Sequence, residues 1–205
     1  MRVILEEVGK KYNRDWIFKG INVELSQGQR IAVIGPNGSG KSTLIQIIAG
    51  NLLCTKGRIA YNIDGIPIDP AEVYSRLFIV APYLELPDDL ELIEFLKFHF
   101  QFKKIRSGCS VADLPELLQL EGNERKRIRH FSTGMKQRLK LGSAFFSDVP
   151  LLLLDEPATN LDSKGMDWYL RMVESLPGEQ ILVVCSNRSE EYVFCNSHLD
   201  ILNFK

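Results

Sequence analysis

The apolar residues of the N-terminal quarter fall into short runs, which is typical of strands. Arg2–Val8 and Ile17–Leu25 are predicted to be strands, with a turn at Tyr12–Asp15. A third run, Ile31–Ile34, leads into a glycine-rich segment, and the apolar residues of Lys41–Ala49 after it have helical spacing. A strand, a glycine-rich loop and a helix in this order predict the start of an α/β unit.

The middle of the chain has a different pattern. Gly57–Ile68 is predicted to be a polar hairpin, because Asp64-Gly65 is a favoured turn pair, and Leu77–Ala81 to be a further strand. From Tyr83 to Phe131 the pattern is helical and rich in aromatic residues, so we expect a helical insertion in an otherwise alternating sheet. Four aromatic residues of this insertion are either core or an exposed groove for a partner helix: Phe95, Phe98, Phe100 and Phe102.

The C-terminal third returns to continuous apolar runs. Leu151–Leu154 and Ile181–Cys185 flank a helical stretch around Trp168–Leu176, and Ile201-Leu202 is predicted to be a last short strand. Apolar runs separated by helices are typical of parallel strands that are buried on both faces. The pattern therefore predicts an α/β fold with a mostly parallel sheet.

Composition narrows the class of protein. The chain has 205 residues, 45% hydrophobic and 25% charged, which excludes collagen-like and disordered classes. Its 25 basic and 26 acidic residues give a formal net charge of -1, so no overall field attracts nucleic acid or an anionic membrane. The four cysteines form no C-x-x-C pair, and no apolar run approaches the roughly 20 residues that span a bilayer. We expect a cytoplasmic protein.

Residues 35–42 match the pattern G-x-x-x-x-G-K-[ST]. Glycines let backbone N–H groups face phosphate oxygens, and the helix that follows points its positive end at the same anion. Lys41 is expected to reach the β- and γ-phosphates, and the Ser42 hydroxyl to ligate Mg²⁺. By itself the motif does not separate kinases, GTPases and motor ATPases. The predicted nucleotide-binding residues, which we name the phosphate loop, are Gly35, Pro36, Asn37, Gly38, Ser39, Gly40, Lys41, Ser42 and Thr43.

Two acidic residues follow the apolar run Leu151–Leu154. A buried strand that ends in carboxylates places them where open α/β sheets bind ligands. Asp155 is expected to hold Mg²⁺ through water, and Glu156 to polarise the attacking water as a general base. The alternative is an acidic strand end that caps a nearby helix.

A second candidate anion site precedes these acids. Ser132 is placed to cap a helix that begins near Gly134. A helix N-terminus with a serine and a glycine can bind an anion, although an ordinary capped helix has the same sequence.

These motifs together resemble the nucleotide-binding subunit of ABC transporters, over essentially the whole chain. The phosphate loop matches the Walker A motif, and Phe131–Met135 reads F-S-T-G-M where the family has L-S-G-G-Q. Leu151–Pro157 matches the Walker B strand with its catalytic glutamate, and Thr159–Asp162 the D-loop. Tyr12 lies where the family places an aromatic residue that stacks on adenine.

The resemblance implies a fold and a mechanism. The fold is a P-loop NTPase core with a mostly parallel sheet, an N-terminal antiparallel β subdomain and a helical subdomain at about 83–146, all in one nucleotide-binding domain over 1–205. Two such domains close head to tail over two molecules of ATP with Mg²⁺, and Ser132 and Gly134 contact the nucleotide of the partner subunit. Ser42 and Asp155 hold the metal. A transmembrane permease docks on the helical insertion, which places the protein on the inner face of the cell membrane.

Three positions depart from the family pattern. Thr133 and Met135 replace glycine and glutamine in the signature, although the wording G-M-K-Q-R is familiar in exporter-type members. Pro82 stands where the Q-loop glutamine is expected, and it has no side-chain donor or acceptor. Asn187 replaces the switch histidine, so it can donate a hydrogen bond to the γ-phosphate but cannot carry charge. We expect intact ATP binding and hydrolysis that is slow or dependent on a partner.

Other functions compete with an ATPase subunit of a membrane exporter. One is a soluble ATP-driven clamp or switch that acts on nucleic acid or ribosomes, and another is a small-molecule kinase. The neutral charge disfavours the clamp, and the acids together with the signature and D-loop disfavour the kinase. Arg125–His130 is basic, but we interpret it as a solvated helix face and expect no nucleic-acid partner.

Overall fold

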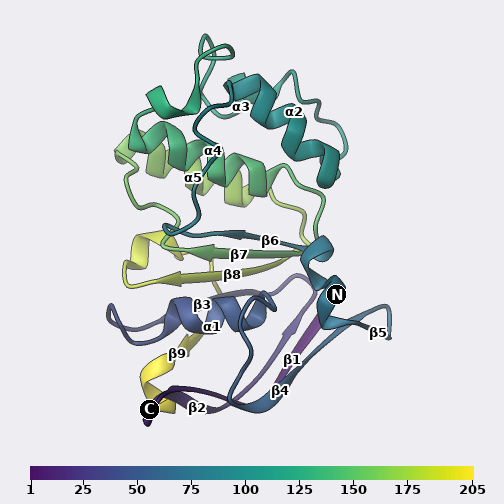
Figure 1. Cartoon of the computed structure of the whole chain (residues 1–205), viewed down its shortest axis with the longest axis vertical. Coiled ribbons are helices and arrows are strands. Elements are labelled where there is room, and N and C mark those ends of the chain that lie inside the picture. The colour runs from purple at the N-terminus through teal and green to yellow at the C-terminus, as the bar shows by residue number, and fades with distance from the viewer. The chain divides into compact units, whose positions relative to one another are not determined.

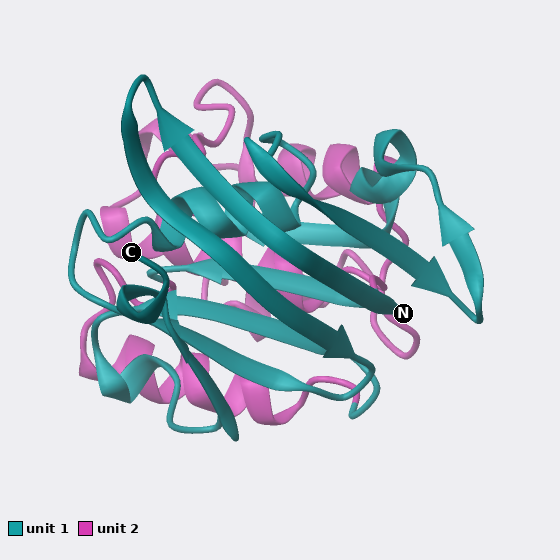
Figure 2. Ribbon diagram, turned by 90° about the horizontal axis from the view of Figure 1, so that it is seen from below, with its two compact units in different colours: residues 1–79, 150–156, 178–205 teal, residues 80–149, 157–177 magenta.

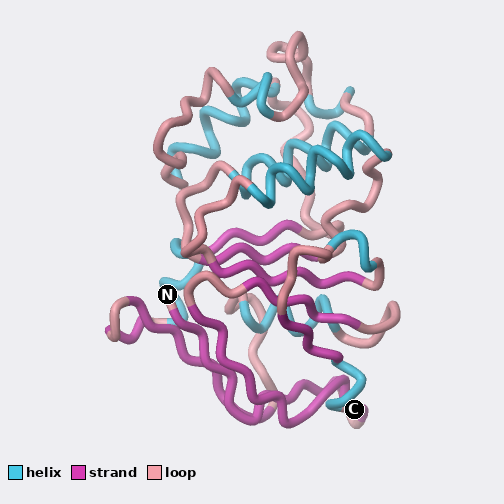
Figure 3. Tube along the Cα trace, turned by 180° about the vertical axis from the view of Figure 1, so that it is seen from behind, coloured by secondary structure: helices cyan, strands magenta, loops and turns pink.

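The structure is a computed structural model that describes all 205 residues. The chain folds into two compact units (Figure 2). The first contains residues 1–79, 150–156 and 178–205, and the second contains residues 80–149 and 157–177. The strands belong to the first unit, apart from the last residue of one of them, and all but one of the α-helices belong to the second (Figure 3).

An antiparallel sheet forms one part of the first unit (Figure 1). Its strands, in spatial order, are β2 (Asp15–Ser26), β1 (Arg2–Tyr12), β4 (Lys56–Ile63) and β5 (Ile66–Ile68). Asp64 and Gly65 both have positive φ, 51° and 81°, between β4 and β5. Two residues of this conformation match the twist of the flanking strands. The predicted hairpin and the antiparallel N-terminal subdomain are therefore confirmed.

The second sheet of the molecule has five strands. Its spatial order is β6 (Leu77–Val80), β7 (Leu151–Asp155), β8 (Ile181–Ser186), β3 (Arg30–Ile34) and β9 (Ser197–Asp200). β8 is parallel to both β7 and β3, and β3 is parallel to β9. Every residue of β7 and β8 is buried, as continuous apolar runs predict. The predicted mostly parallel sheet is confirmed.

The last predicted strand is wrong. β9 ends at Asp200, and Ile201–Phe204 forms a 3-10 helix, η4. The Asp200 carboxylate accepts a hydrogen bond from the Leu202 N–H at 2.9 Å. This local bond offers the backbone an alternative to the sheet ladder, so the chain turns where apolar composition alone predicted extension.

The core of the first unit lies around α1 (Lys41–Ile48). Leu44, Ile45 and Ile47 are buried in one apolar cluster with side chains from β1, β2, β3, β7 and β8. Burying each such side chain stabilises the fold by roughly 1.5–3 kcal/mol. Two further 3-10 helices complete the unit, η1 (Pro70–Arg76) and η3 (Ser189–Glu191). α1 is thereby fixed against the sheet, and the loop that precedes it has a rigid support.

The second unit is helical. Its elements are α2 (Leu92–Phe102), α3 (Leu114–Leu117), η2 (Ile128–His130), α4 (Thr133–Phe145) and α5 (Ser163–Glu174). Trp168 of α5 donates its indole N–H to the Leu117 carbonyl at 2.9 Å. Gly142 of α4 lies directly against Leu118, where a larger residue would collide with it. The helices of the unit therefore pack through large aromatic and small residues.

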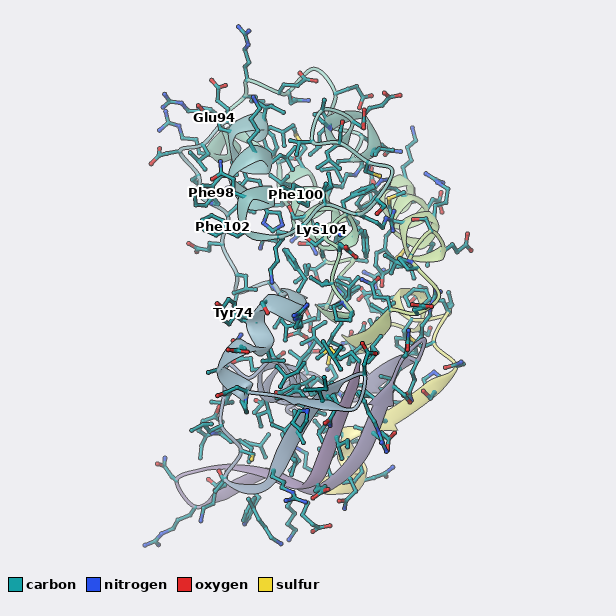
Figure 4. The ribbon with its side chains drawn as sticks, turned by 90° about the vertical axis from the view of Figure 1, so that its right-hand side faces the viewer. Tyr74, Glu94, Phe98, Phe100, Phe102 and Lys104 are labelled. Atoms are coloured by element: carbon teal, nitrogen blue, oxygen red, sulfur yellow. The ribbon has the colours of Figure 1, made fainter.

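The aromatic stretch of α2 divides into two kinds of residue. Phe95 is buried, whereas Phe98 and Phe102 are 52% and 72% exposed and form an edge-to-face pair at 5.1 Å (Figure 4).

The basic run Arg125–His130 before the signature is not a helix face, because it ends in the single turn η2. Arg129 in this turn pairs with Asp89 at 3.3 Å. No helix of the protein has both the length and the apolarity needed to cross a membrane.

Candidate nucleotide-binding site

The phosphate loop connects β3 to α1 within the first unit. Gly35 and Gly40 have φ of +147° and +106°, which disfavours residues with a side chain. A Cβ on Gly35 would lie 2.8 Å from Ser39 Oγ, and one on Gly40 would collide with Ile17 of β2. The motif glycines are therefore required by the path of the backbone as well as by approach to a phosphate.

Lys41 is enclosed by its own loop. The side chain is only 4% exposed, and Nζ donates hydrogen bonds to the Gly35 carbonyl at 2.8 Å and the Pro36 carbonyl at 3.1 Å. An ammonium has three donors, so one N–H is left for an anion. Gly40 precedes α1 without any side-chain cap, and the first turn has no acidic residue. The positive end of α1 and the Lys41 charge therefore act at the same place.

Asp155 ends β7 and is almost completely buried. Neither carboxylate oxygen has a hydrogen-bond partner in the protein. Burial raises the pKa of Asp155, and Glu156 adds to this, while the nearby Ser42 hydroxyl and Lys41 ammonium lower it. A buried carboxylate without partners is costly unless a cation compensates it. The oxygens of Asp155 and Ser42 are the ligand type that Mg²⁺ prefers, so this pair fits a magnesium ion.

Glu156 has a strained backbone. Its φ is +46°, which costs a residue with a Cβ about 1–2 kcal/mol. The Glu156 N–H donates to the Cys185 carbonyl of β8 at 2.8 Å, and this bond holds the unusual conformation. The side chain is partly exposed next to the buried Asp155. Backbone strain that is stabilised in this way is common at sites where a side chain must be aimed.

Asn187, which follows β8, contacts the phosphate loop. Its Nδ2 donates to Asn37 Oδ1 at 3.0 Å. The two residues are 150 positions apart, and they meet because β8 and β3 are neighbours in the parallel sheet. Asn187 and the loop residues Gly35 and Pro36 also line one open pocket of about 340 Å³. The family resemblance predicts that Asn187 donates to the γ-phosphate, but it did not reveal this partner.

Tyr12 lies at the end of β1, in the hairpin that leads to Ile17. The Tyr12 ring is half exposed, and Lys10 Nζ lies 5.2 Å from its centroid. Since Ile17 touches Gly40, this hairpin borders the phosphate loop. The structure thus brings Tyr12, the loop, Asp155, Glu156 and Asn187 together in one unit.

The remaining predicted residues belong to the second unit. Ser132 Oγ accepts a hydrogen bond from the Met135 N–H at 3.2 Å, which confirms the predicted cap of α4. A Cβ on Gly134 would lie 3.2 Å from the Asn160 carbonyl, so the start of α4 is close to the 159–162 segment. Pro82 follows β6, is exposed and offers no polar side-chain atom. Pro82 therefore cannot take the role of the expected glutamine.

Comparisons with known proteins agree with this geometry. A model of the ABC transporter family matches residues 18–159, which is more than half of the chain. A cytochrome c biogenesis ATP-binding export protein of Mesorhizobium japonicum is 34% identical over 162 residues, which cover 79% of each chain. A Nod factor export ATP-binding protein of Cupriavidus pinatubonensis is 27% identical over 197 residues, which cover 94% of this chain. The chain spans 61% of the length of that second relative.

Solved structures share the fold. A dimeric bacterial ABC transporter cassette superposes with a TM-score of 0.81 at 23% identity, over 97% of this chain and 94% of the other. The same cassette is also known as a dimer in a post-hydrolysis state bound to ADP and Pi. With the family model and the relatives, this likeness leads to one conclusion: the chain belongs to the ABC transporter family and has the ATP-binding cassette fold of that family.

Proposed function

We propose that the chain binds and hydrolyses ATP and thereby powers transport through a transmembrane partner. The observation that carries this proposal is the presence, in one unit, of a cation and a carboxylate that form no ion pair with each other. Lys41 donates only to neutral carbonyls, and neither carboxylate oxygen of the buried Asp155 accepts a hydrogen bond. A phosphate chain with a magnesium ion would satisfy both groups together, because Lys41 would donate to the phosphates and Asp155 would hold the cation.

Each residue has a distinct role in this proposal. Tyr12 stacks on the adenine, and the amides and Lys41 of the phosphate loop bind the phosphates. Ser42 and Asp155 hold Mg²⁺, which supplies neutralisation of the phosphate charge when bound. Glu156 accepts the proton of the attacking water. Asn187 donates a hydrogen bond to the γ-phosphate after it exchanges its present partner Asn37.

Hydrolysis is expected to be slow. A neutral amide at Asn187 replaces a charge-assisted hydrogen bond, which forfeits about 1 kcal/mol or more. If that bond strengthens in the transition state, about 1.4 kcal/mol corresponds to a tenfold slower reaction. Pro82 removes a second polar contact. Turnover then depends on a partner that completes the site.

The partners proposed are a second copy of this chain and a transmembrane permease. Ser132 and Gly134 would contact the nucleotide of the partner copy, so that ATP drives head-to-tail dimerisation. The dimeric cassette of the same fold and the export proteins among the relatives support this assignment. The protein then works in the cytoplasm, on the inner face of the cell membrane.

Purified chain tests the proposal directly. Glu156→Gln keeps the size of the side chain but cannot accept a proton, so this variant should bind ATP without hydrolysing it. Because bound ATP holds the dimer closed in this proposal, we expect light scattering to show conversion from monomer to dimer when MgATP is added. Asn187→His is expected to raise turnover above that of the unmodified chain. A Glu156→Gln chain that stays monomeric at saturating MgATP contradicts the dimer, and brisk hydrolysis by the unmodified chain with no gain in Asn187→His contradicts the slow site.

A further inference from the structure

The segment that follows β9 contacts the phosphate loop at both of its ends. A Cβ on Gly35, at the start of the loop, would lie 2.9 Å from Ile201 Cγ2. Near the other end, Lys205 Nζ donates hydrogen bonds to the Ser39 carbonyl at 2.7 Å and to the Ile17 carbonyl of β2 at 2.9 Å. Figure 1 shows this end of the chain beside β2. None of the roles assigned above uses these contacts.

The bond to Ser39 fixes one peptide plane of the loop. No peptide bond of the chain is cis, so the Ser39 C=O and the Gly40 N–H point in opposite directions. Lys205 holds the carbonyl on one face and thereby directs the Gly40 N–H to the other face. Gly40 has φ of +106° and lacks a side chain to restrict it, so its peptide needs an outside constraint. Lys205 supplies that constraint.

The bond to Ile17 connects the loop to the hairpin. Ile17 follows the β1–β2 turn that carries Tyr12, and its side chain packs where Gly40 lacks a Cβ. Lys205 therefore joins the hairpin expected to stack on the base to the loop expected to bind the phosphates. Both hydrogen-bond partners of the ammonium are backbone carbonyls, one from each of these segments.

We infer that Lys205 is a positioning residue for nucleotide binding, which holds the Ser39–Gly40 peptide and the β1–β2 hairpin in register for a ligand with a purine base and a phosphate chain. This inference rests on the proposed function of the same site. Without this bond the loop peptide must be ordered when the ligand binds, and we expect this cost to weaken affinity about tenfold.

The test compares three lysine variants of the full chain by titration with MgATP. Lys205→Met keeps the aliphatic stem and removes the donors, and we expect it to bind MgATP about tenfold more weakly. Lys205→Arg restores the donors and is expected to recover most of the affinity. Lys19→Met removes an equal charge from the exposed face of β2 and is expected to bind like the unmodified chain. In NMR spectra without nucleotide, the Gly40 amide resonance should move in Lys205→Met and stay in place in Lys19→Met.

The outcomes separate this inference from the proposed function. If Lys41→Ala loses MgATP affinity while Lys205→Met keeps it, the positioning role is wrong and nucleotide binding stands. An equal loss in Lys19→Met, or no recovery in Lys205→Arg, also overturns the role. If Lys41→Ala keeps full affinity, the proposed function itself is wrong. Lys205→Leu, which also lacks donors, repeats the comparison should Lys205→Met unfold at a lower temperature than the unmodified chain.

Discussion

Two helices of the molecule begin at glycine-containing motifs, and they begin differently. α1 starts after Gly40 with no side-chain cap, whereas Ser132 already accepts the Met135 N–H at the start of α4. The first four amides of a helix have no partner within it. No side chain caps these donors in α1, whereas α4 satisfies one of them with Ser132. We therefore expect the start of α1 to bind an anion more strongly than the start of α4.

The lysines at the two helix starts show the same contrast. Lys41 is bound only to loop carbonyls, while Lys136 of α4 pairs with the Asp88 carboxylate at 2.7 Å. The first charge is available to a phosphate, and the second is neutralised by a neighbour. We expect the phosphate loop to bind nucleotide alone and the α4 motif to contribute only when a nucleotide is already held by another copy.

The largest expected difference in unfolding free energy is between alanine substitutions at Gly40 and at Gly134. Gly40→Ala places a Cβ against Ile17 at a φ that disfavours alanine, so we expect a loss of about 3–4 kcal/mol in unfolding free energy and no detectable nucleotide binding. Gly134→Ala lies in a helix, where alanine is favoured, and its new contact with Asn160 is tight but tolerable. We expect a change within about 1 kcal/mol. Urea unfolding of both variants measures the difference, and equal losses would contradict the contrast.

A second prediction concerns acid, which acts on the second unit through His99 of α2. Burial, with a smaller effect of Lys103, lowers the pKa of His99 to about 4, below the value of about 6.5 in an unfolded chain. The unfolded chain therefore binds more protons, and stability is lost as the pH falls from about 6.5 towards 4. Between pH 7.5 and pH 4.5 we expect His99 to account for about 2 kcal/mol.

Urea unfolding at the two pH values measures this loss. His99→Gln removes the titrating group and should lose less stability at pH 4.5 than the unmodified chain. His130→Gln is the matched control, because it makes the same substitution at an exposed histidine of the same unit. A His99→Gln chain as sensitive to acid as the unmodified one would show that His99 does not cause the effect.

Replacing Asp155 is expected to raise stability but to impair metal-dependent binding. Because burial raises its pKa, the ionised carboxylate destabilises the nucleotide-free protein at neutral pH. Asp155→Asn should therefore raise the unfolding free energy by about 1 kcal/mol and weaken the magnesium dependence of ATP binding. Thermal unfolding and titration with ATP, each with and without Mg²⁺, check the two parts. A less stable Asp155→Asn chain with unchanged magnesium dependence would contradict the metal site.

The cap of α4 gives the last prediction, which concerns stability alone. Ser132→Ala removes the acceptor of the Met135 N–H and should lower the unfolding free energy by about 1 kcal/mol. MgATP affinity of the single chain should stay unchanged, because the cap belongs to the motif expected to act on a partner copy. Isothermal titration with MgATP measures this affinity. If it fell as far as that of a phosphate-loop variant, the α4 motif would act on the chain's own nucleotide, which contradicts the role expected for it.

The sequence predicted those features whose causes are local. The β4–β5 turn follows from Asp64-Gly65, the buried strand β7 from its apolar run, and the α4 cap from Ser132. The short strand at Ile201-Leu202 was predicted wrongly, because one bond from Asp200 redirects an apolar segment.

Contacts that depend on the order of strands in the sheet could not be predicted from the sequence. Asn187 meets Asn37 and Lys205 meets Ser39 across 150 and 166 positions, which no local pattern encodes. The strained φ of Glu156 is another such feature, since the Cys185 carbonyl that stabilises it comes from the neighbouring strand. Motif residues can be found from spacing, but the contacts that orient them arise from tertiary structure.

The most direct test of the central claim is the MgATP affinity of Lys41→Ala beside that of Lys136→Ala. Loss of the enclosed ammonium removes a charge-assisted bond to phosphate and is expected to weaken binding about 100-fold, or about 3 kcal/mol. Lys136→Ala removes a lysine already paired with Asp88 and is expected to bind MgATP within about twofold of the unmodified chain. Equal affinities of Lys41→Ala and the unmodified chain would contradict the claim that the phosphate loop is the nucleotide site.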